Sequence, residues 1–160
     1  GPYPDYKDPD TGVIEYRGQG LRGEQKLVLG NKLLEDARLE RKPVRYWHRP
    51  SGGSWVFESW VIVADRTQII EEDSDSISVQ RILWFLVPIP STDSSQWPRE
   101  IINSKILDLP DIPNEKPRRT KDLLQDYSSI SAQLEIESTG KIVQLHLEHN
   151  TRDEKKLEIL

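Results

Sequence analysis

Five of the chain's nine glycines lie between Gly12 and Gly30, where they alternate with amide, aromatic and basic side chains. The densest part of this segment reads Tyr16-Arg17-Gly18-Gln19-Gly20-Leu21-Arg22-Gly23-Glu24-Gln25-Lys26-Leu27 and is followed by Gly30-Asn31-Lys32. Glycine is used where the backbone takes a positive φ or where another group must approach it closely. Such a composition is typical of a loop that contacts a ligand and not of a packed core. The rest of the chain must therefore form a scaffold that holds this loop.

The sequence on both sides of the loop predicts several strands and one helix. In chain order, periodicity and turn residues predict a short strand over 13–16, a helix over 25–39 that begins near Asn31, a hairpin with strands over 42–48 and 55–64, and a buried strand over 79–89. The acidic stretch 65–78 is expected to be a solvated loop. Strand alternation places Trp55 and Phe57 on one face and Trp60 on the other, with core packing as their expected role.

The composition changes after Pro90. Residues 91–117 are rich in proline and show little periodicity, which predicts a connector that runs over the surface. The remainder predicts a short helix over 120–127 and a hairpin with strands over 133–137 and 141–148. We therefore expect a first domain over residues 3–90, and an extension over residues 91–160 that completes it or begins the next domain.

The net charge of -5 argues against a nucleic-acid partner, but the distribution of charge favours one. Residues 17–49 hold nine lysines and arginines against four acids, so the acidic excess belongs to the rest of the chain. Local potential matters more than net charge, because salt screens charges more than about 10 Å apart. A basic region on an acidic body can thus attract a polyanion.

Several kinds of site are disfavoured by the residues themselves. Cysteine is absent, which excludes disulfides and thiolate chemistry. His146 and His149 would point to opposite faces of a strand and have no third ligand at a useful spacing, so we expect no metal. No nuclease or phosphate-loop pattern is convincing, so we expect no catalytic residue and no cofactor in this chain.

The first residues and the hydropathy of the chain give expectations about its source and its location. It contains no methionine and begins Gly1-Pro2, which we interpret as a protease scar on a piece of a longer protein. No apolar run approaches the length of a membrane span. We therefore expect a cytoplasmic location with no membrane partner.

Three local patterns resemble the SRA (YDG) domains, a family that reads modified cytosine in DNA. The stretch Tyr16-Arg17-Gly18-Gln19-Gly20 is similar to the family's Tyr-Thr-Gly-x-Gly. Glu24-Gln25-Lys26-Leu27, followed after three residues by Asn31-Lys32-Leu33-Leu34, resembles the family's acid-Gln-x-Leu and Asn-basic-x-Leu at the same spacing. Lys42-Pro43-Val44-Arg45 resembles the opening of the family's next strand. The resemblance covers about residues 3–90 and is nearest to modules of bacterial or archaeal modification-dependent restriction systems.

The chain also departs from the family pattern. The threonine after the tyrosine is Arg17 here, and the Tyr-Asp-Gly triplet falls on Phe57-Glu58-Ser59. The register before the loop is ambiguous, so either Asp5 or Asp8 takes the place of the pocket carboxylate.

The resemblance implies a fold and a site. The implied fold is an α+β, PUA-like (SRA-like) curved β-barrel with one or two helices, followed by the C-terminal connector and hairpin. The implied base pocket is formed by Tyr16, Tyr3 or Tyr6 as a second wall, Asp5 or Asp8, and the backbone at Gly18. The expected DNA-binding residues are Arg17, Gln19, Arg22, Lys26, Asn31, Lys32 and Arg45, with helix capping as an alternative role for Asn31.

The implied function is recognition of 5-methyl- or 5-hydroxymethylcytosine in duplex DNA by base flipping. An enzyme or reader can inspect every edge of a base only after the base leaves the stack. The expected partners are modified duplex DNA and an effector nuclease or NTPase domain outside this chain. Alternatives are a module of the same fold that reads another modification or RNA, a nuclease with catalytic groups in residues 91–160, and a protein-interaction domain.

Overall fold

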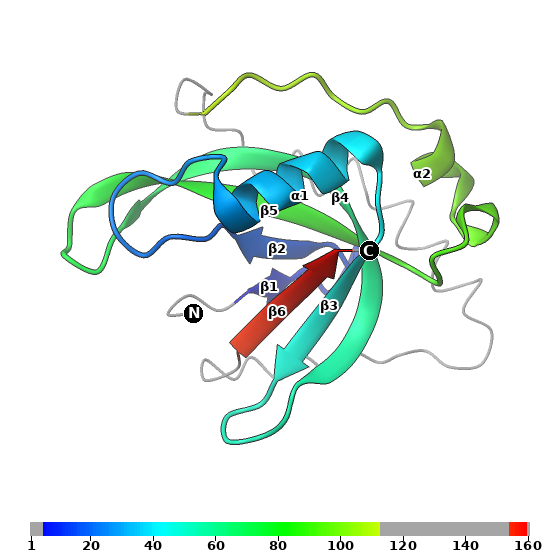
Figure 1. The fold of residues 1–160 in the computed structure, drawn as a ribbon, viewed down its shortest axis with the longest axis horizontal. Coiled ribbons are helices and arrows are strands. Elements are labelled where there is room, and N and C mark those ends of the chain that lie inside the picture. Colours follow the sequence, from blue (N-terminus) through cyan, green and yellow to red (C-terminus); the bar gives the residue numbers. More distant parts are fainter. Residues whose placement is uncertain (1–4, 113–153, 160) are drawn as a thin grey trace.

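One curled antiparallel sheet forms the framework of the molecule (Figure 1). The computed structural model describes residues 5–112 and 154–159. Its strands are β1 (Tyr6–Lys7), β2 (Ile14–Arg17), β3 (Val44–Arg49), β4 (Val56–Glu72), β5 (Ser78–Ile89) and β6 (Glu154–Ile159). The strands are arranged in the order β1-β2-β5-β4-β3-β6, and every neighbouring pair is antiparallel. The helices are α1 (Leu29–Glu40), α2 (Arg99–Asn103) and a 3-10 turn, η1 (Ser94–Gln96).

The curl of the sheet comes from β4, which is long and irregular. Its register shifts against β5 between Val63 and Asp65, and against β3 opposite Tyr46 and Trp47. Each shift leaves one extra residue on β4, Ala64 in the first case and Glu58 in the second. Such bulges bend a strand and increase its twist, so β4 can belong to a curved sheet.

The bulge at Glu58 corrects the expected arrangement of the hairpin aromatics. The Phe57 and Trp60 rings are in contact, with centroids 5.6 Å apart, and therefore lie on the same face of β4. The extra residue between them reverses the alternation on which the expectation of opposite faces depended.

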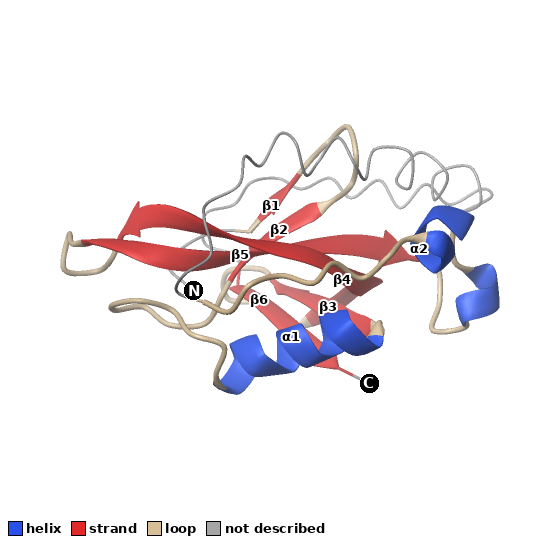
Figure 2. Cartoon of the chain, turned by 90° about the horizontal axis from the view of Figure 1, so that it is seen from above, coloured by secondary structure: helices blue, strands red, loops and turns tan. Residues whose placement is uncertain are grey.

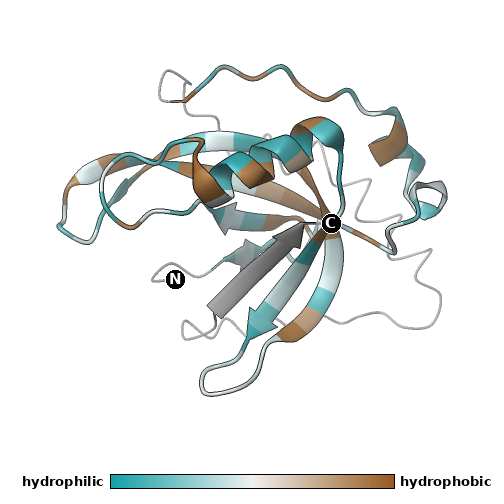
Figure 3. Cartoon of the chain, viewed as in Figure 1, coloured by the Kyte–Doolittle hydropathy of each residue, from teal (hydrophilic) through white to brown (hydrophobic). Residues whose placement is uncertain are grey.

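Two apolar clusters cover the two faces of the sheet. Helix α1 lies along one of these faces (Figure 2). On one face, Leu34 and Ala37 of α1 pack against residues from the middle strands, such as Trp84 of β5. On the other face, Trp97 and Ile101 pack against the opposite side of β5. The hydropathy colouring shows the same apolar concentration in the middle of β5 (Figure 3). Since β5 is buried on both faces, its near-continuous apolar run correctly predicts a central strand.

Helix α1 is fastened to the sheet by a buried ionic network. Glu35 accepts from Arg38 Nε at 2.6 Å and also pairs with Arg66 of β4. The two arginines are 3% and 1% exposed. They further donate to the carbonyls of Leu107 and Pro110, at 2.7 and 3.0 Å. The network thus joins α1, β4 and the segment that passes over α1 (Figure 1).

The structure shows where the predictions of secondary structure were right. The strands expected at 13–16, 42–48, 55–64 and 79–89 correspond to β2, β3, the first half of β4 and β5. The expectation of a loop over 65–78 was wrong, because residues 65–72 continue β4 and only 73–77 form the turn. Asp65, Arg66, Thr67 and Gln68 are at most 1% exposed. Their polar character suggested solvent, but Asp65 and Arg66 make hydrogen bonds inside the protein, and Thr67 and Gln68 also have interaction partners.

Residues beyond the sheet are described only in part. Residues 91–112 contain η1 and α2 and otherwise form an extended connector. The helix predicted over 120–127 and the hairpin predicted over 133–148 lie outside the described residues. Within the described residues, no helix is long and apolar enough to cross a membrane.

Candidate nucleic-acid interface

The glycine-rich loop is held in shape by the buried amide of Gln25. Its Nε2 donates to the carbonyls of Gly18 and Gly20, at 2.7 and 2.9 Å. Its Oε1 accepts from the backbone N–H of Ile82 in β5, at 2.7 Å. The Gln25 side chain thus joins the loop backbone at Gly18 and Gly20 to strand β5.

Asn31 forms a second amide clamp from the first turn of α1. It is 2% exposed, and its Oδ1 accepts from Gln19 N at 2.8 Å. Its Nδ2 donates to the carbonyls of Gln19 and Lys26, both at 3.0 Å. The capping role was wrong: Val28 occupies the N-cap position and makes no side-chain capping bond. Asn31 lies inside the helix and organises the loop.

These clamps explain why two of the loop glycines are required. A Cβ on Gly18 would lie 2.8 Å from both Asn31 Oδ1 and Gln25 Oε1, and a Cβ on Gly30 would lie 2.6 Å from Gln19 Oε1. The groups that approach these glycines closely belong to the chain itself.

The variant Gly18→Ala is therefore expected to destabilise the domain by about 1–3 kcal/mol, as overpacking does. The added methyl group would also lie 3.1 Å from Ile82 Cβ, so all three neighbours must move. Urea unfolding measures the loss. Gly53→Ala is the matched control, since its closest contact would be 3.4 Å, and it should unfold like the wild type. Equal midpoints for the two variants would contradict the clamp.

Arg81 of β5 supports the outer part of the loop. It is 1% exposed and donates to the carbonyls of Gly20 and Leu21, at 2.5 and 2.6 Å. Asp73, in the β4–β5 turn, accepts from Gly23 N at 3.2 Å. Sequence reasoning missed both residues, since each acts across a long separation along the chain.

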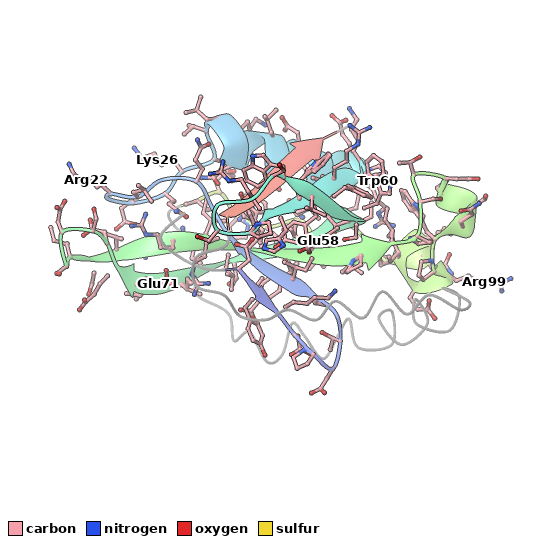
Figure 4. The ribbon with its side chains drawn as sticks, turned by 90° about the horizontal axis from the view of Figure 1, so that it is seen from below. Arg22, Lys26, Glu58, Trp60, Glu71 and Arg99 are labelled. Carbon is pink, nitrogen blue, oxygen red and sulfur yellow. The ribbon has the colours of Figure 1, made fainter. Side chains whose placement is uncertain are left out.

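The held loop presents basic side chains outward. Lys26 is exposed, and the Arg22 side chain is 78% exposed with only a 3.7 Å approach to Asp75. Figure 4 shows Arg22 and Lys26 at one end of the molecule, pointing away from it. Gln19 is also exposed at this end, although its Oε1 accepts from Gly30 N at 2.9 Å.

The other predicted basic residues have partners within the protein. Arg17 lies 2.7 Å from Glu71, and Lys32 lies 2.6 Å from Asp36. The Arg45 guanidinium lies 4.9 Å from the centroid of the Trp60 ring. The structure therefore brings Gln19, Arg22 and Lys26 together, and places Arg17 and Arg45 elsewhere.

Two tyrosines and a carboxylate meet on the face of the sheet that α1 covers. Tyr46 is 2% exposed, and its hydroxyl donates to Asp5 Oδ2 at 2.9 Å. Tyr16 packs against the same apolar cluster as Tyr46. Burial, followed by the charge of Asp5, raises the pKa of Tyr16 to about 12. Burial and the charges of Asp5 and Glu58 also raise the pKa of Tyr46. Asp5 thus lies within the field of both phenols.

Two further pocket candidates, Asp8 and Tyr6, are not seen beside Tyr46. Asp8 Oδ1 accepts from Asp10 N at 2.8 Å and Thr11 N at 2.7 Å, so this carboxylate shapes the β1–β2 turn. Tyr6 is 36% exposed, and Tyr3 lies outside the described residues. Tyr46 was missed by sequence reasoning. Its pairing with Ser59, the last residue of the altered triplet, depends on the register between β3 and β4 and gives no local signal in the sequence.

Because the pKa values of Tyr16 and Tyr46 are raised, we expect the free energy of unfolding to fall at alkaline pH. The folded protein keeps the Tyr16 proton at pH values above the ordinary phenol pKa of 10.0. The raised pKa therefore contributes its full stabilisation below pH 10, and this stabilisation is lost as the pH rises toward 12. The expected loss from Tyr16 alone is about 1.4 kcal/mol per pH unit over this range. Urea unfolding at a series of pH values measures it. Tyr16→Phe should show a shallower fall, and an identical slope would contradict the burial of this phenol.

The curled antiparallel sheet, with its helices and its amide-clamped loop, has the PUA-like α+β fold that the sequence predicted. The family model "ScoMcrA-like, SRA domain" matches residues 1–108. The chain therefore belongs to the ScoMcrA-like SRA domain family, which confirms the resemblance and the α+β fold class. Membership of this family also agrees with a recognition module and not a catalytic one.

Two solved structures resemble the chain. One is described as "Structure of the Type IV phosphorothioation-dependent restriction endonuclease ScoMcrA", with 39% identity and a TM-score of 0.56 over 64% of this chain and 20% of that chain. The other is "Sulfur binding domain and SRA domain of ScoMcrA complexed with phosphorothioated DNA", with 39% identity and a TM-score of 0.57 over 64% of this chain and 32% of that chain. The alignments thus span less than two thirds of either structure. A comparison with curated proteins gave no match.

Proposed function

We propose that this domain binds duplex DNA and takes a modified cytosine, flipped out of the helix, beside Asp5 and Tyr16. The observation that carries the proposal is the Tyr46–Asp5 hydrogen bond next to the partly buried Tyr16 ring. A carboxylate can accept from the exocyclic amine of cytosine. The hydroxyl of Tyr46 would hold that carboxylate in a fixed orientation.

The free-energy cost of flipping the base is similar to the free energy that the proposed contacts would return. Flipping a base costs a few kcal/mol in lost stacking and pairing. Stacking on an aromatic ring returns about 1–3 kcal/mol per base, and a hydrogen bond to a charged group adds about 1.5–3 kcal/mol. Tyr16 and Asp5 together are therefore sufficient, in magnitude, to hold an extruded base.

The exposed loop is the proposed contact to the DNA backbone. Arg22 and Lys26 would neutralise phosphates, and the affinity would then fall with salt at a slope of about -0.9 per contact. Gln19 would contact the duplex beside them. We further propose that residues 3–90 form the recognition domain, which the segment 91–112 and β6 complete. An effector nuclease or NTPase would lie outside this chain, as the endonuclease relative suggests.

A second candidate ligand is phosphorothioated DNA. One similar structure holds a sulfur binding domain and an SRA domain with such DNA. In that case the domain would contact the duplex without reading a mark on cytosine.

Fluorescence anisotropy with four matched duplexes tests these alternatives. The duplexes carry no modification, 5-methylcytosine, 5-hydroxymethylcytosine, or a phosphorothioate at the same position. The proposal predicts tighter binding to one of the modified-cytosine duplexes than to the unmodified one. Preference for the phosphorothioate alone supports the second candidate, and equal affinity for all four overturns both.

A further inference from the structure

The β3–β4 hairpin carries a row of aromatic and basic side chains that the proposed base site does not use. Arg45 stacks on Trp60 with its guanidinium carbon 4.9 Å from the ring centroid, and Arg49 approaches Trp55 at 5.7 Å. The Trp47 and Phe57 rings meet edge to face between these pairs, with centroids 5.6 Å apart. We call these six residues the aromatic–arginine ladder: Arg45, Trp47, Arg49, Trp55, Phe57 and Trp60.

The ladder lies on the opposite face of β3 from the base site. Residues 45, 47 and 49 alternate with Val44 and Tyr46, which point into the cluster covered by α1. Trp60 packs instead against the cluster on the other face. A ligand on the ladder would therefore not compete directly with a base beside Tyr46.

The centre of the ladder is accessible to solvent. Phe57, in the middle level of the ladder, is 41% exposed. The strand β6 places Glu158, Lys156 and Glu154 opposite Arg45, Trp47 and Arg49 in the register. The paired positions of β3 and β6 hold three basic and two acidic residues and thus little net charge, so stacking and not net charge would dominate binding at this surface.

We propose that the ladder is a second binding surface, which takes unpaired bases of single-stranded nucleic acid by stacking. Its three levels follow every second residue of β3 and are therefore about 6.6–6.8 Å apart. This spacing is about twice the 3.4 Å rise per nucleotide of a stacked strand. Aromatic rings and arginine planes bind every base, because every base has a π-face. A proline-rich peptide repeats at about 9 Å and fits this spacing less well.

Anisotropy with a fluorescent oligothymidine of about twelve nucleotides tests the proposal, since strands of this length suit one small domain. The wild-type domain should bind it and show quenched tryptophan fluorescence. Phe57→Ala should weaken this binding at least about fivefold, while its preference among the four duplexes above stays that of the wild type. Val56→Ala is the matched control and should bind like the wild type.

The outcomes separate this surface from the proposed function. The ladder is supported if Phe57→Ala loses single-strand binding but keeps the duplex preference of the wild type. This result supports the ladder even if the domain recognises no modification of cytosine. A second variant, Arg49→Gln, should also weaken single-strand binding while the fold is retained by circular dichroism. The proposal is overturned if the wild type does not bind the oligonucleotide, if Phe57→Ala binds it unchanged, or if only a proline-rich peptide quenches the tryptophans.

Discussion

Replacing Glu35 by alanine is expected to lower the free energy of unfolding by about 3–5 kcal/mol, the usual cost of breaking a buried ion pair from one side. Glu35 is the carboxylate that pairs with both Arg38 and Arg66. Both arginines are buried, so the variant would leave two buried cations without this carboxylate, although each still donates to a carbonyl oxygen. Urea unfolding measures the change, or the variant fails to fold.

The neighbouring acid Asp36 provides the control. Its partner Lys32 is exposed, and exposed pairs contribute little. Asp36→Ala should therefore unfold at the wild-type urea concentration. A Glu35→Ala protein as stable as Asp36→Ala would show that the network does not fasten α1 to the sheet. Since α1 carries Asn31, we also expect Glu35→Ala to loosen the glycine-rich loop, seen as faster amide exchange at Gln19.

Replacing Tyr16 by alanine is expected to remove most of the preference for modified duplex. Loss of one stacking ring costs about 1–3 kcal/mol, or about 5- to 150-fold in affinity. Weak binding to unmodified duplex should remain, because Arg22 and Lys26 are unchanged and exposed. Anisotropy on the matched duplexes measures both quantities.

Two further variants serve as controls for Tyr16→Ala. Tyr16→Phe keeps the ring and should keep the preference. Asp5→Ala keeps the ring but removes the carboxylate that faces Tyr46, and should lose discrimination with little change in the weak binding. If Tyr16→Ala is folded and keeps the full preference, Tyr16 serves only to pack against the core.

The parts of the fold that the sequence predicted are those with a local pattern. Strand β5 contains a near-continuous apolar run, and β3 alternates, so both were predicted correctly. The second half of β4 was missed because Arg66 and its neighbours are polar and buried together. Their partners, such as Glu35, lie far away in the sequence, and no local pattern reveals such a pairing.

The site was predicted to a similar extent. The spacing of Gln25 and Asn31 identified the family, but their amides bind the loop itself, which only the three-dimensional contacts reveal. Asp5 and Asp8 were equivalent in the sequence and became distinct once Tyr46 was placed beside Asp5. The bulge at Glu58 leaves no pattern in the sequence, and so the aromatic–arginine ladder could not be predicted.

The most direct test of the account is whether a modified cytosine leaves the double helix when the domain binds. A duplex with 2-aminopurine next to a 5-methylcytosine reports this, because its fluorescence rises when the neighbouring base unstacks. The account predicts a rise of several-fold on saturation with the wild-type domain and little rise with Tyr16→Ala, in keeping with the loss of a stacking partner. Saturated binding of both 5-methyl- and 5-hydroxymethylcytosine duplexes with unchanged fluorescence would contradict it.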